Sequence, residues 1–210
     1  MAVTVHWFGH ASFRISGSKT AFIDPWKLPS NPGSADVVIV SHSHYDHCSP
    51  DDVAAIRGKA TTVLAPPDCA AKLGGAVTTV APGQTHDLNG VTVEAVPAYN
   101  IGKDFHPKAN HWIGAVVQLD GVRVYYAGDT DEIPEMAQLR DIDVALLPVG
   151  GTYTMDAAQA ANAANAIKPA AAIPYHWGDI VGDHSDADAF KAKAACAVTV
   201  LSPGTETTLD

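Results

Sequence analysis

A buried strand that runs directly into a cluster of histidines constrains this chain more than any other feature of its sequence. The run Asp36–Val40 (DVVIV) is rich in β-branched residues and predicts a strand that is buried on both faces. Four side chains of types that bind metals follow this strand at once: His42, His44, Asp46 and His47. Any fold of this chain must therefore bury the strand and leave its carboxyl end open.

The spacing within the cluster indicates a metal site. Residues two apart in an extended segment point the same way, so His42 and His44 can hold one ion. Asp46 and His47 lie one step further on and can face a second ion. Imidazole and carboxylate ligands suit Zn²⁺, Mn²⁺ or Fe²⁺. A solvated histidine-rich turn explains a single histidine better than four groups at this spacing, so the sequence predicts one or two divalent transition metals as cofactor.

Two later strands also end at residues that can bind metals. The predicted strand Val122–Tyr126 is followed by Asp129, and the predicted strand Ala171–Pro174 is followed by His176. Each signal is weak alone, since aspartate is common in turns and a histidine beside a tryptophan can belong to the core. Together with the first cluster, they mean that three predicted strands are followed by residues of types that bind metals.

The order of the predicted elements mixes β-hairpins with β-α-β units, which indicates an α/β fold of mixed sheets with helices outside. The 210 residues suit a single domain, residues 1–210. The segment Pro97–Trp112 has no regular pattern and is predicted to be a loop. The predicted strands are Val3–Phe8, Ser12–Ile15, Thr20–Ile23, Asp36–Val40, Thr61–Leu64, Val77–Val80, Val91–Val96, Ile113–Leu119, Val122–Tyr126, Val144–Leu147, Ala171–Pro174 and Val198–Leu201, and the predicted helices are Asp51–Arg57, Asp68–Leu73, Met155–Ile167 and Asp186–Ala195.

Composition and charge limit the classes of partner. The chain carries 13 basic and 23 acidic residues, a formal net charge of −10, and such a surface repels nucleic acid and anionic lipid. No apolar segment approaches the ~20 residues of a membrane span, so stable membrane insertion is not expected. The spacing of the three cysteines, Cys48, Cys69 and Cys196, matches neither a disulfide framework nor a zinc site, and the sequence shows no signal peptide. These two features predict reduced thiols in a cytoplasmic protein. The expected partner is a small-molecule substrate, and the oligomeric state stays open.

Three motifs in this order resemble the metallo-β-lactamase fold superfamily of metal-dependent hydrolases: His42-x-His44-x-Asp46-His47, Gly128-Asp129-Thr130 and His176. Two earlier stretches, Trp7–Ser12 and Ile23–Trp26, are similar to the branch that includes the L-ascorbate-6-phosphate lactonase and the N-acyl-phosphatidylethanolamine phospholipase D. The resemblance covers most of the chain and is specific for the superfamily, not for a substrate. It implies a four-layer αβ/βα sandwich, with two mixed β-sheets, outer helices and metals at one edge.

The resemblance also implies roles for the polar residues of these motifs. His10 is expected near the metals, as a contact to the substrate or to a metal ligand, or as a structural histidine of its loop. Asp46 is implied as a metal ligand that can also orient the nucleophile. The implied ligands are His42 and His44 for the first metal, Asp46, His47 and His176 for the second, and Asp129 as the bridge between both.

The chain departs from the superfamily pattern at the first metal. Most members have a third histidine between the cluster and the bridging aspartate, where this chain has Asn100. His106 could fill the gap, but Pro107 favours an extended backbone at His106 and is expected to hold it elsewhere. His111 lies too far along the chain. An amide oxygen is a weaker ligand for Zn²⁺ than imidazole, so the first site is predicted to bind less tightly than the second.

These features predict a hydrolase in which a metal-activated hydroxide attacks a small, anionic ester, lactone or phosphodiester. Lys103, His106 and Lys108 could bind a carboxylate or phosphate of the substrate, or they could belong to a solvated loop. No G-x-S-x-G motif offers a serine nucleophile instead. Structural or surface roles are expected for three other histidines: His6, His86 and His184.

Three other functions are compatible with these motifs. A mononuclear-iron redox enzyme, as in the persulfide dioxygenases, can use the same fold. A metal-binding or ligand-binding protein whose catalysis has decayed is a second alternative, although the complete ligand set of the second site argues against it. An RNA-processing nuclease is a third, and the net charge of −10 argues against it.

Overall fold

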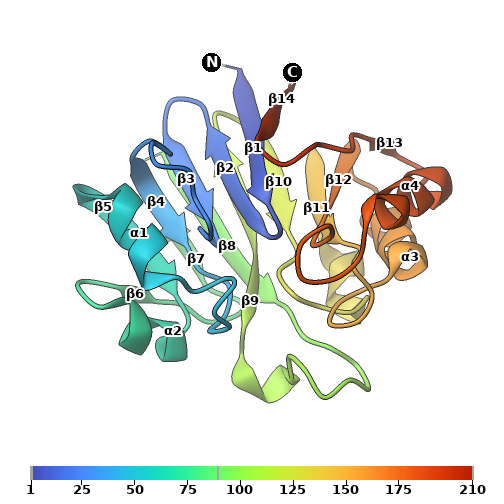
Figure 1. The fold of residues 1–210 in the computed structure, drawn as a ribbon, viewed down its shortest axis with the longest axis horizontal. Coiled ribbons are helices and arrows are strands. Elements are labelled where there is room, and N and C mark those ends of the chain that lie inside the picture. Colours follow the sequence, from blue (N-terminus) through green and yellow to red (C-terminus); the bar gives the residue numbers. More distant parts are fainter. Residues whose placement is uncertain (1, 89, 210) are drawn as a thin grey trace.

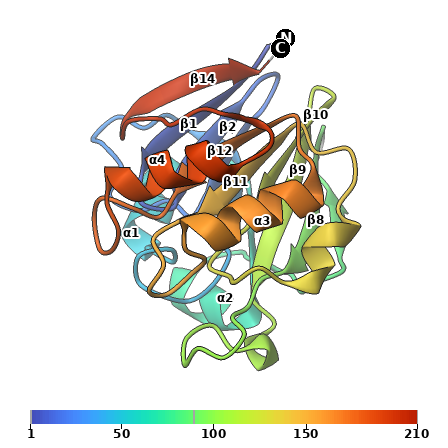
Figure 2. The same cartoon turned by 90° about the vertical axis from the view of Figure 1, so that its right-hand side faces the viewer.

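Two β-sheets lie face to face in the computed structural model, and helices cover the outer side of each sheet (Figures 1 and 2). The structure describes residues 2–88 and 90–209. Each sheet contains seven strands and mixes parallel with antiparallel pairs. The predicted fold class, an α/β sandwich with two mixed sheets and outer helices, is therefore confirmed.

The first sheet has the strand order β14-β1-β2-β3-β4-β5-β6. Its strands β1 to β3 form antiparallel hairpins, and the neighbours from β3 to β6 are parallel. The helices α1 (Pro50–Ile56) and α2 (Pro67–Leu73) connect these parallel strands. The strands are β1 (Val3–Gly9), β2 (Ser12–Ser16), β3 (Thr20–Ile23), β4 (Ala35–Ile39), β5 (Arg57–Ala65), β6 (Thr78–Thr79) and β14 (Thr205–Leu209).

The second sheet has the order β13-β12-β11-β10-β9-β8-β7. Strands β7 to β10 are antiparallel neighbours, whereas β10 to β13 are parallel. The helices α3 (Ala157–Ile167) and α4 (His184–Lys193) connect the last parallel strands. The remaining elements are β7 (Thr85–Asp87), β8 (Val91–Pro97), β9 (Ile113–Leu119), β10 (Val122–Tyr126), β11 (Val144–Pro148), β12 (Ala171–Tyr175), β13 (Ala197–Val198) and the 3₁₀ turns η1 (Lys108–Asn110) and η2 (Pro134–Gln138).

The main hydrophobic core fills the space between the sheets and continues beneath α3 and α4. Phe13 of the first sheet meets two rings of the second sheet edge to face, with centroids 6.1 Å from Tyr126 and 5.4 Å from Tyr175. α3 presents buried alanines to this core, and Asp156 caps its first turn. Among the described residues, no helix has both the length and the apolar character needed to cross a membrane.

Most predicted elements are present, and the differences have identifiable causes. α3 begins at Ala157 and not at Met155, because the Asp156 side chain caps the helix there. The predicted strand Val198–Leu201 is reduced to β13, and the sequence predicts no strand where β14 lies. β14 is polar, so its position comes from antiparallel backbone pairing with β1 and not from burial of its side chains.

The carboxyl ends of the parallel strands form the edge of the sandwich at which polar residues gather. In the first sheet, β3 leads to Asp24 and its parallel neighbour β4 leads to the histidine cluster. In the second sheet, the parallel strands β10 and β12 lead to Asp129 and His176. Loops from both sheets therefore converge at one edge, as is typical of ligand sites in folds with parallel strands.

Candidate metal centre

Three imidazoles from two loops meet at this edge. The Nδ1 atom of His44 lies 3.1 Å from His42 Nε2 and 3.1 Å from His106 Nε2. Zinc–nitrogen distances of about 2.0–2.1 Å place neighbouring ligand atoms roughly 3.3 Å apart in a tetrahedral site. The ring of Trp112 supports His42 and His44, with centroids 4.9 and 5.0 Å away. His42, His44 and His106, the first group, can therefore hold one metal ion.

A second group lies beside the first and contains His10, Asp46, His47 and His176. One ligand atom of each residue lies within 4.8 Å of the others. His10 Nε2 lies 2.9 Å from Asp46 Oδ2, in a hydrogen bond that the ring N–H donates, and His47 Nε2 lies 3.6 Å from the same oxygen. Because three of these residues follow strands of the first sheet and His176 follows β12, both sheets contribute to this second group, which could hold a metal ion.

Asp129 lies between the two groups and approaches both. Its Oδ2 atom is 3.2 Å from His106 Nε2 and 3.2 Å from His176 Nε2. Its Oδ1 atom is 3.4 Å from His47 Nε2. A single carboxylate thus approaches both groups and could serve a metal ion held by either of them.

Several buried polar atoms of these groups have no hydrogen-bond partner. They include His47 Nε2, His176 Nε2 and Asp129 Oδ1. A buried polar atom without a partner costs about 1–3 kcal/mol, and such atoms are rare in native proteins. A cation between the two imidazoles and the carboxylate would satisfy all three atoms at once. The residues of the site therefore fit a divalent metal ion.

The protonation states that the environment favours at His42, His44 and Asp129 also suit metal binding. Burial, reinforced by charge on His47, holds the pKa of His42 well below its usual range, and burial lowers the pKa of His44. Burial alone would raise the pKa of Asp129, but His176 and His47 outweigh it and hold that pKa well below its usual range. Neutral imidazoles and ionised carboxylates are the forms that bind metals.

Asp24, which follows β3, orients His47 from the side opposite to Asp129. Its Oδ2 atom accepts hydrogen bonds from His47 Nδ1 at 2.7 Å, Ser41 Oγ at 2.5 Å and Tyr126 Oη at 2.6 Å. A ring that donates from Nδ1 can present the lone pair of Nε2 to a metal. Burial disfavours charge on His47, but Asp129 and Asp24 outweigh it and raise the pKa of His47 well above its usual range. Metal binding must therefore displace a proton from this ring.

The role of Asp24 can be tested with asparagine, which keeps the shape but loses the charge. In Asp24→Asn, we expect metal affinity at the second group to fall by about 10–100-fold, because the support of His47 weakens. Calorimetric titration of the metal-free protein measures this change. Asp36→Asn is the matched control, since Asp36 accepts from Thr20 N at 2.9 Å and pairs with Lys19. Equal metal affinity in the wild type and in Asp24→Asn would contradict this role.

His106, and not Asn100, lies beside His42 and His44, so the geometry favours His106 as the third residue of the first group. The Asn100 Nδ2 atom donates to Tyr153 O at 2.7 Å and lies 3.2 Å from His106 Nδ1, behind the ring. His106 has φ +54°, in the left-handed region and not in the extended region expected before Pro107. Because three imidazoles meet here, the reason to expect weaker binding at the first site no longer holds.

Lys103 and Lys108 bind carboxylates of the protein, which argues against the anion pocket, one of the two alternatives that the sequence leaves open for them. Lys103 Nζ donates to Asp131 Oδ1 and to Thr154 O, both at 2.5 Å. Lys108 Nζ donates to Glu135 Oε1 at 2.9 Å. Both ammonium groups are therefore paired with carboxylates of the protein, and neither lies among the residues that line the pocket at the metal centre.

His10 makes contacts that are compatible with both of its alternative roles. Its ring joins the second group through Asp46, and its centroid lies 4.1 Å from that of His176. Its carbonyl oxygen accepts from Trp7 Nε1 and from His176 N, both at 3.0 Å, and so links the loop after β1 to the end of β12. Four other histidines of the described chain lie outside both groups: His6, His86, His111 and His184.

The backbone is strained at several residues of the centre. Four of them have φ values between +43° and +63°: His10, Asp24, His106 and His176. This region costs a non-glycine residue about 1–3 kcal/mol, and such residues persist where surrounding contacts hold them, often at functional sites. Packing is equally close at Gly150, where a Cβ atom would overlap the His176 carbonyl oxygen. The packing of these loops therefore fixes the positions of the candidate ligands.

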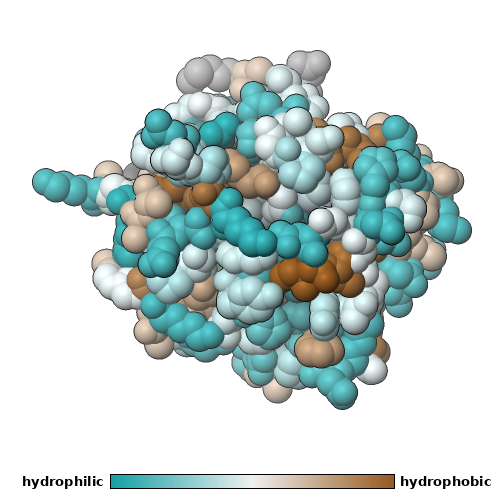
Figure 3. All heavy atoms as spheres, viewed as in Figure 1, coloured by the Kyte–Doolittle hydropathy of each residue, from teal (hydrophilic) through white to brown (hydrophobic). Residues whose placement is uncertain are grey.

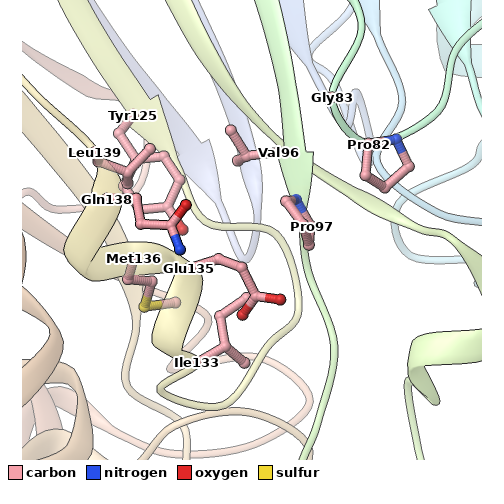
Figure 4. A pocket seen from close by; sticks show the side chains of 10 residues that line it. All are labelled: Pro82, Gly83, Val96, Pro97, Tyr125, Ile133, Glu135, Met136, Gln138 and Leu139. Carbon is pink, nitrogen blue, oxygen red and sulfur yellow. The ribbon is translucent and has the colours of Figure 1, made fainter.

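A pocket of about 240 Å³ gives a substrate access to the metal centre. A larger pocket of about 380 Å³ lies elsewhere, between Pro82, the end of β8 and η2 (Figure 4). The carboxylate of Glu135 in that second pocket already binds Lys108, and its lining, all within the described chain, includes no histidine. The residues that line the pocket at the metal centre are His44, Tyr45, Asp46, Phe105, His106, Asp129, Tyr153, His176 and Ile180.

Comparison with known proteins first defines the class of this chain. The Beta-lactamase superfamily domain matches residues 4–176, which include every candidate ligand of both groups. The match agrees with the two mixed sheets and with the histidine–aspartate centre at their edge. The superfamily predicted from the motifs is therefore confirmed.

The relatives define the family within this class. A UPF0173 metal-dependent hydrolase from Thermococcus onnurineus is 34% identical over 219 aligned positions, which span 96% of this chain and 97% of the relative. A crystal structure from Parabacteroides distasonis is 33% identical, with a TM-score of 0.84 over 94% of this chain and 92% of that chain. Igni18, a metallo hydrolase from Ignicoccus hospitalis, is 27% identical, with a TM-score of 0.83 over 100% of this chain and 99% of that chain. The chain belongs to the UPF0173 family of metal-dependent hydrolases.

Proposed function

We propose that this protein hydrolyses a small ester, lactone or phosphodiester by means of divalent metals bound at this centre. One observation carries the proposal: Asp129 joins two groups of ligands, at 3.2 Å from both His106 and His176. Two metals that share a carboxylate are a common means of activating water for hydrolysis. The relatives are described as metal-dependent or metallo hydrolases, which favours hydrolysis over the redox alternative.

The ligand types favour Zn²⁺, with Mn²⁺ and Fe²⁺ as alternatives. Imidazole suits zinc and iron, and the additional carboxylate of Asp46 makes the second group more suitable for a harder ion such as Mn²⁺. The proposed ligands are His42, His44, His106 and Asp129 for the first metal, and Asp46, His47, His176 and Asp129 for the second.

In the proposed mechanism, divalent metals held by these residues would supply hydroxide near neutral pH and would polarise the substrate oxygen. Asp46 orients the attacking water and can accept its proton. Burial opposes a charge on this carboxylate, but the hydrogen bond from His10 and the nearby His47 keep the pKa of Asp46 below its usual value. The water oxygen forms the new bond to carbon or phosphorus, the bond to the leaving oxygen breaks, and that oxygen receives the proton.

We expect the purified protein to hold up to two equivalents of transition metal per chain, and to lose hydrolysis when a chelator removes them. Elemental analysis measures the metal content. A panel of generic ester, lactone and phosphodiester substrates, tested with several metals, measures the activity. Less than about a tenth of an equivalent after reconstitution would refute the metal centre. Tight metal binding without hydrolysis of any substrate would instead support the ligand-binding alternative.

A further inference from the structure

The pocket at the metal centre has an apolar wall. Tyr45, Phe105 and Ile180 line it and are 69%, 45% and 37% exposed, although large apolar side chains are usually buried. They belong to three separate loops, which follow β4, β8 and β12, and Tyr153 adds a fourth loop. Figure 3 shows hydrophobic residues, in brown, near the loop that follows β12. Apolar side chains that converge from separate loops mark a surface that binds an apolar ligand.

Contacts between aromatic rings hold this wall in place. The rings of Phe105 and Tyr153 are perpendicular, with centroids 4.8 Å apart. The ring of Tyr45 meets that of Trp26 edge to face, with centroids 6.0 Å apart. Both are preferred arrangements for aromatic pairs. The wall is therefore formed without a ligand, and binding needs little additional ordering of these side chains.

The pocket offers no cationic side chain to a negatively charged substrate. No lysine or arginine of the described chain is among its lining residues, whereas the carboxylates Asp46 and Asp129 are. A negative charge on the substrate, beyond the bond that is broken, would therefore have no protein cation to bind and would be desolvated against the apolar wall. Four lysines in nearby loops and helices bind protein oxygens instead: Lys27, Lys72, Lys103 and Lys108.

We propose that the substrate is an uncharged carboxylic ester or lactone whose group beyond the scissile bond is apolar; this rests on the function proposed above. The wall binds the apolar group while the metal centre faces the carbonyl. Water forms a bond to the carbonyl carbon, the bond to the ester oxygen breaks, and that oxygen receives the proton. The pocket of about 240 Å³ is smaller than most ligand pockets, so the substrate is small. This class differs from the anionic substrate that the sequence predicts.

Two matched esters test the proposal on the metal-loaded protein. Phenyl butyrate and monophenyl succinate share a leaving group and a chain length, but the first ends in a methyl group and the second in a carboxylate. We expect kcat/KM to be at least about tenfold higher for the butyrate, once the rate at which each ester hydrolyses in the same buffer without the protein has been taken into account. Equal values, or a preference for the succinate, would overturn the proposal.

Two isoleucine substitutions separate the wall from general effects of charge. Ile180→Lys places a cation in the wall and is expected to reduce the preference for the butyrate at least about fivefold, mainly through KM for the succinate. Ile101→Lys is the matched control, since Ile101 is 57% exposed and lies outside the pocket lining. An equal change of preference in both variants would show that net charge, and not the wall, selects the substrate.

A binding measurement gives a result that does not depend on catalysis. N-phenylbutanamide and N-phenylsuccinamic acid resemble the two esters but resist hydrolysis, and calorimetry with the metal-free protein should show tighter binding of the butanamide. Tighter binding of the acid would overturn the proposed substrate class. Hydrolysis of phosphodiesters alone would also overturn it and leave the proposed function standing. No hydrolysis of any ester, lactone or phosphodiester by the metal-loaded protein would refute the proposed function itself.

Discussion

Asp129→Asn is expected to remove metal from both groups and to lower kcat/KM by at least about 10³-fold, the largest effect of any single substitution at this centre. The reason is its position, with one oxygen 3.2 Å from both His106 and His176 and the other 3.4 Å from His47. An amide keeps the shape of the side chain but supplies only one neutral oxygen, so it cannot bridge two cations. Elemental analysis and kinetics on the same preparation measure both losses.

His47→Ala gives a graded comparison for this prediction. Because His47 belongs to the second group only, its loss should remove metal there, lower kcat/KM by less than Asp129→Asn does and leave the first group able to bind. Asp143→Asn is the control for the same change of charge at the opposite end of the second sheet, where Asp143 accepts from Arg123 N at 2.7 Å. Wild-type metal content and activity in Asp129→Asn would show that the chemistry lies elsewhere, provided that circular dichroism reports an intact fold.

The convergence of ligands at one edge could be predicted because it follows from local sequence. A β-branched run such as Asp36–Val40 predicts a buried strand, and the side chains that follow it must lie at the end of that strand. The same argument brings Asp129 and His176 to the ends of β10 and β12, and all three ends meet in the structure. Where strands are parallel, chain direction alone decides on which edge their carboxyl ends lie.

The positions of Asp24 and His106 could not be predicted, because they depend on contacts that are distant in sequence. Asp24 is fully buried, and one of its partners, Tyr126, lies 102 residues away. His106 lies in an irregular segment without periodicity, and the preference of a residue before proline for extended backbone is overcome there by tertiary contacts. Local propensity sets a preference of only a few kcal/mol, which packing in a buried loop can exceed.

The same limit explains why the sequence leaves the role of Lys103 and Lys108 open between an anion pocket and a solvated loop. A lysine in an acidic chain near a metal site suggests an anion pocket, but sequence does not show which carboxylate lies opposite it. Lys103 contacts Asp131, 28 residues away, and Lys108 contacts Glu135, 27 residues away. The exposed aromatic and aliphatic side chains of the pocket also carry no periodic signal, since they stand singly in separate loops.

His106→Ala is the second substitution with a large expected effect, because it removes one of three imidazoles from the first group. We expect metal affinity there to fall by about 10²–10³-fold, while the second group keeps its ligands. Calorimetric titration of the metal-free variant should then resolve one tight and one weak class of site. The wild type should not show so large a difference, since three imidazoles serve the first group, and the proposed ligands Asp46, His47 and His176 serve the second beside the shared Asp129.

Variants at Asn100 distinguish a residue that binds metal from one that supports His106. The Asn100 amide lies 3.2 Å from His106 Nδ1, on the far side of the ring from Nε2. Asn100→Ala should therefore weaken the first group by about 10–100-fold, less than His106→Ala does, because the ring loses its orientation but not its lone pair. Asn100→His should not tighten the site, since an imidazole at this position stands behind His106. Tighter binding in Asn100→His, together with unchanged binding in His106→Ala, would restore Asn100 as the ligand position and remove His106 from the centre.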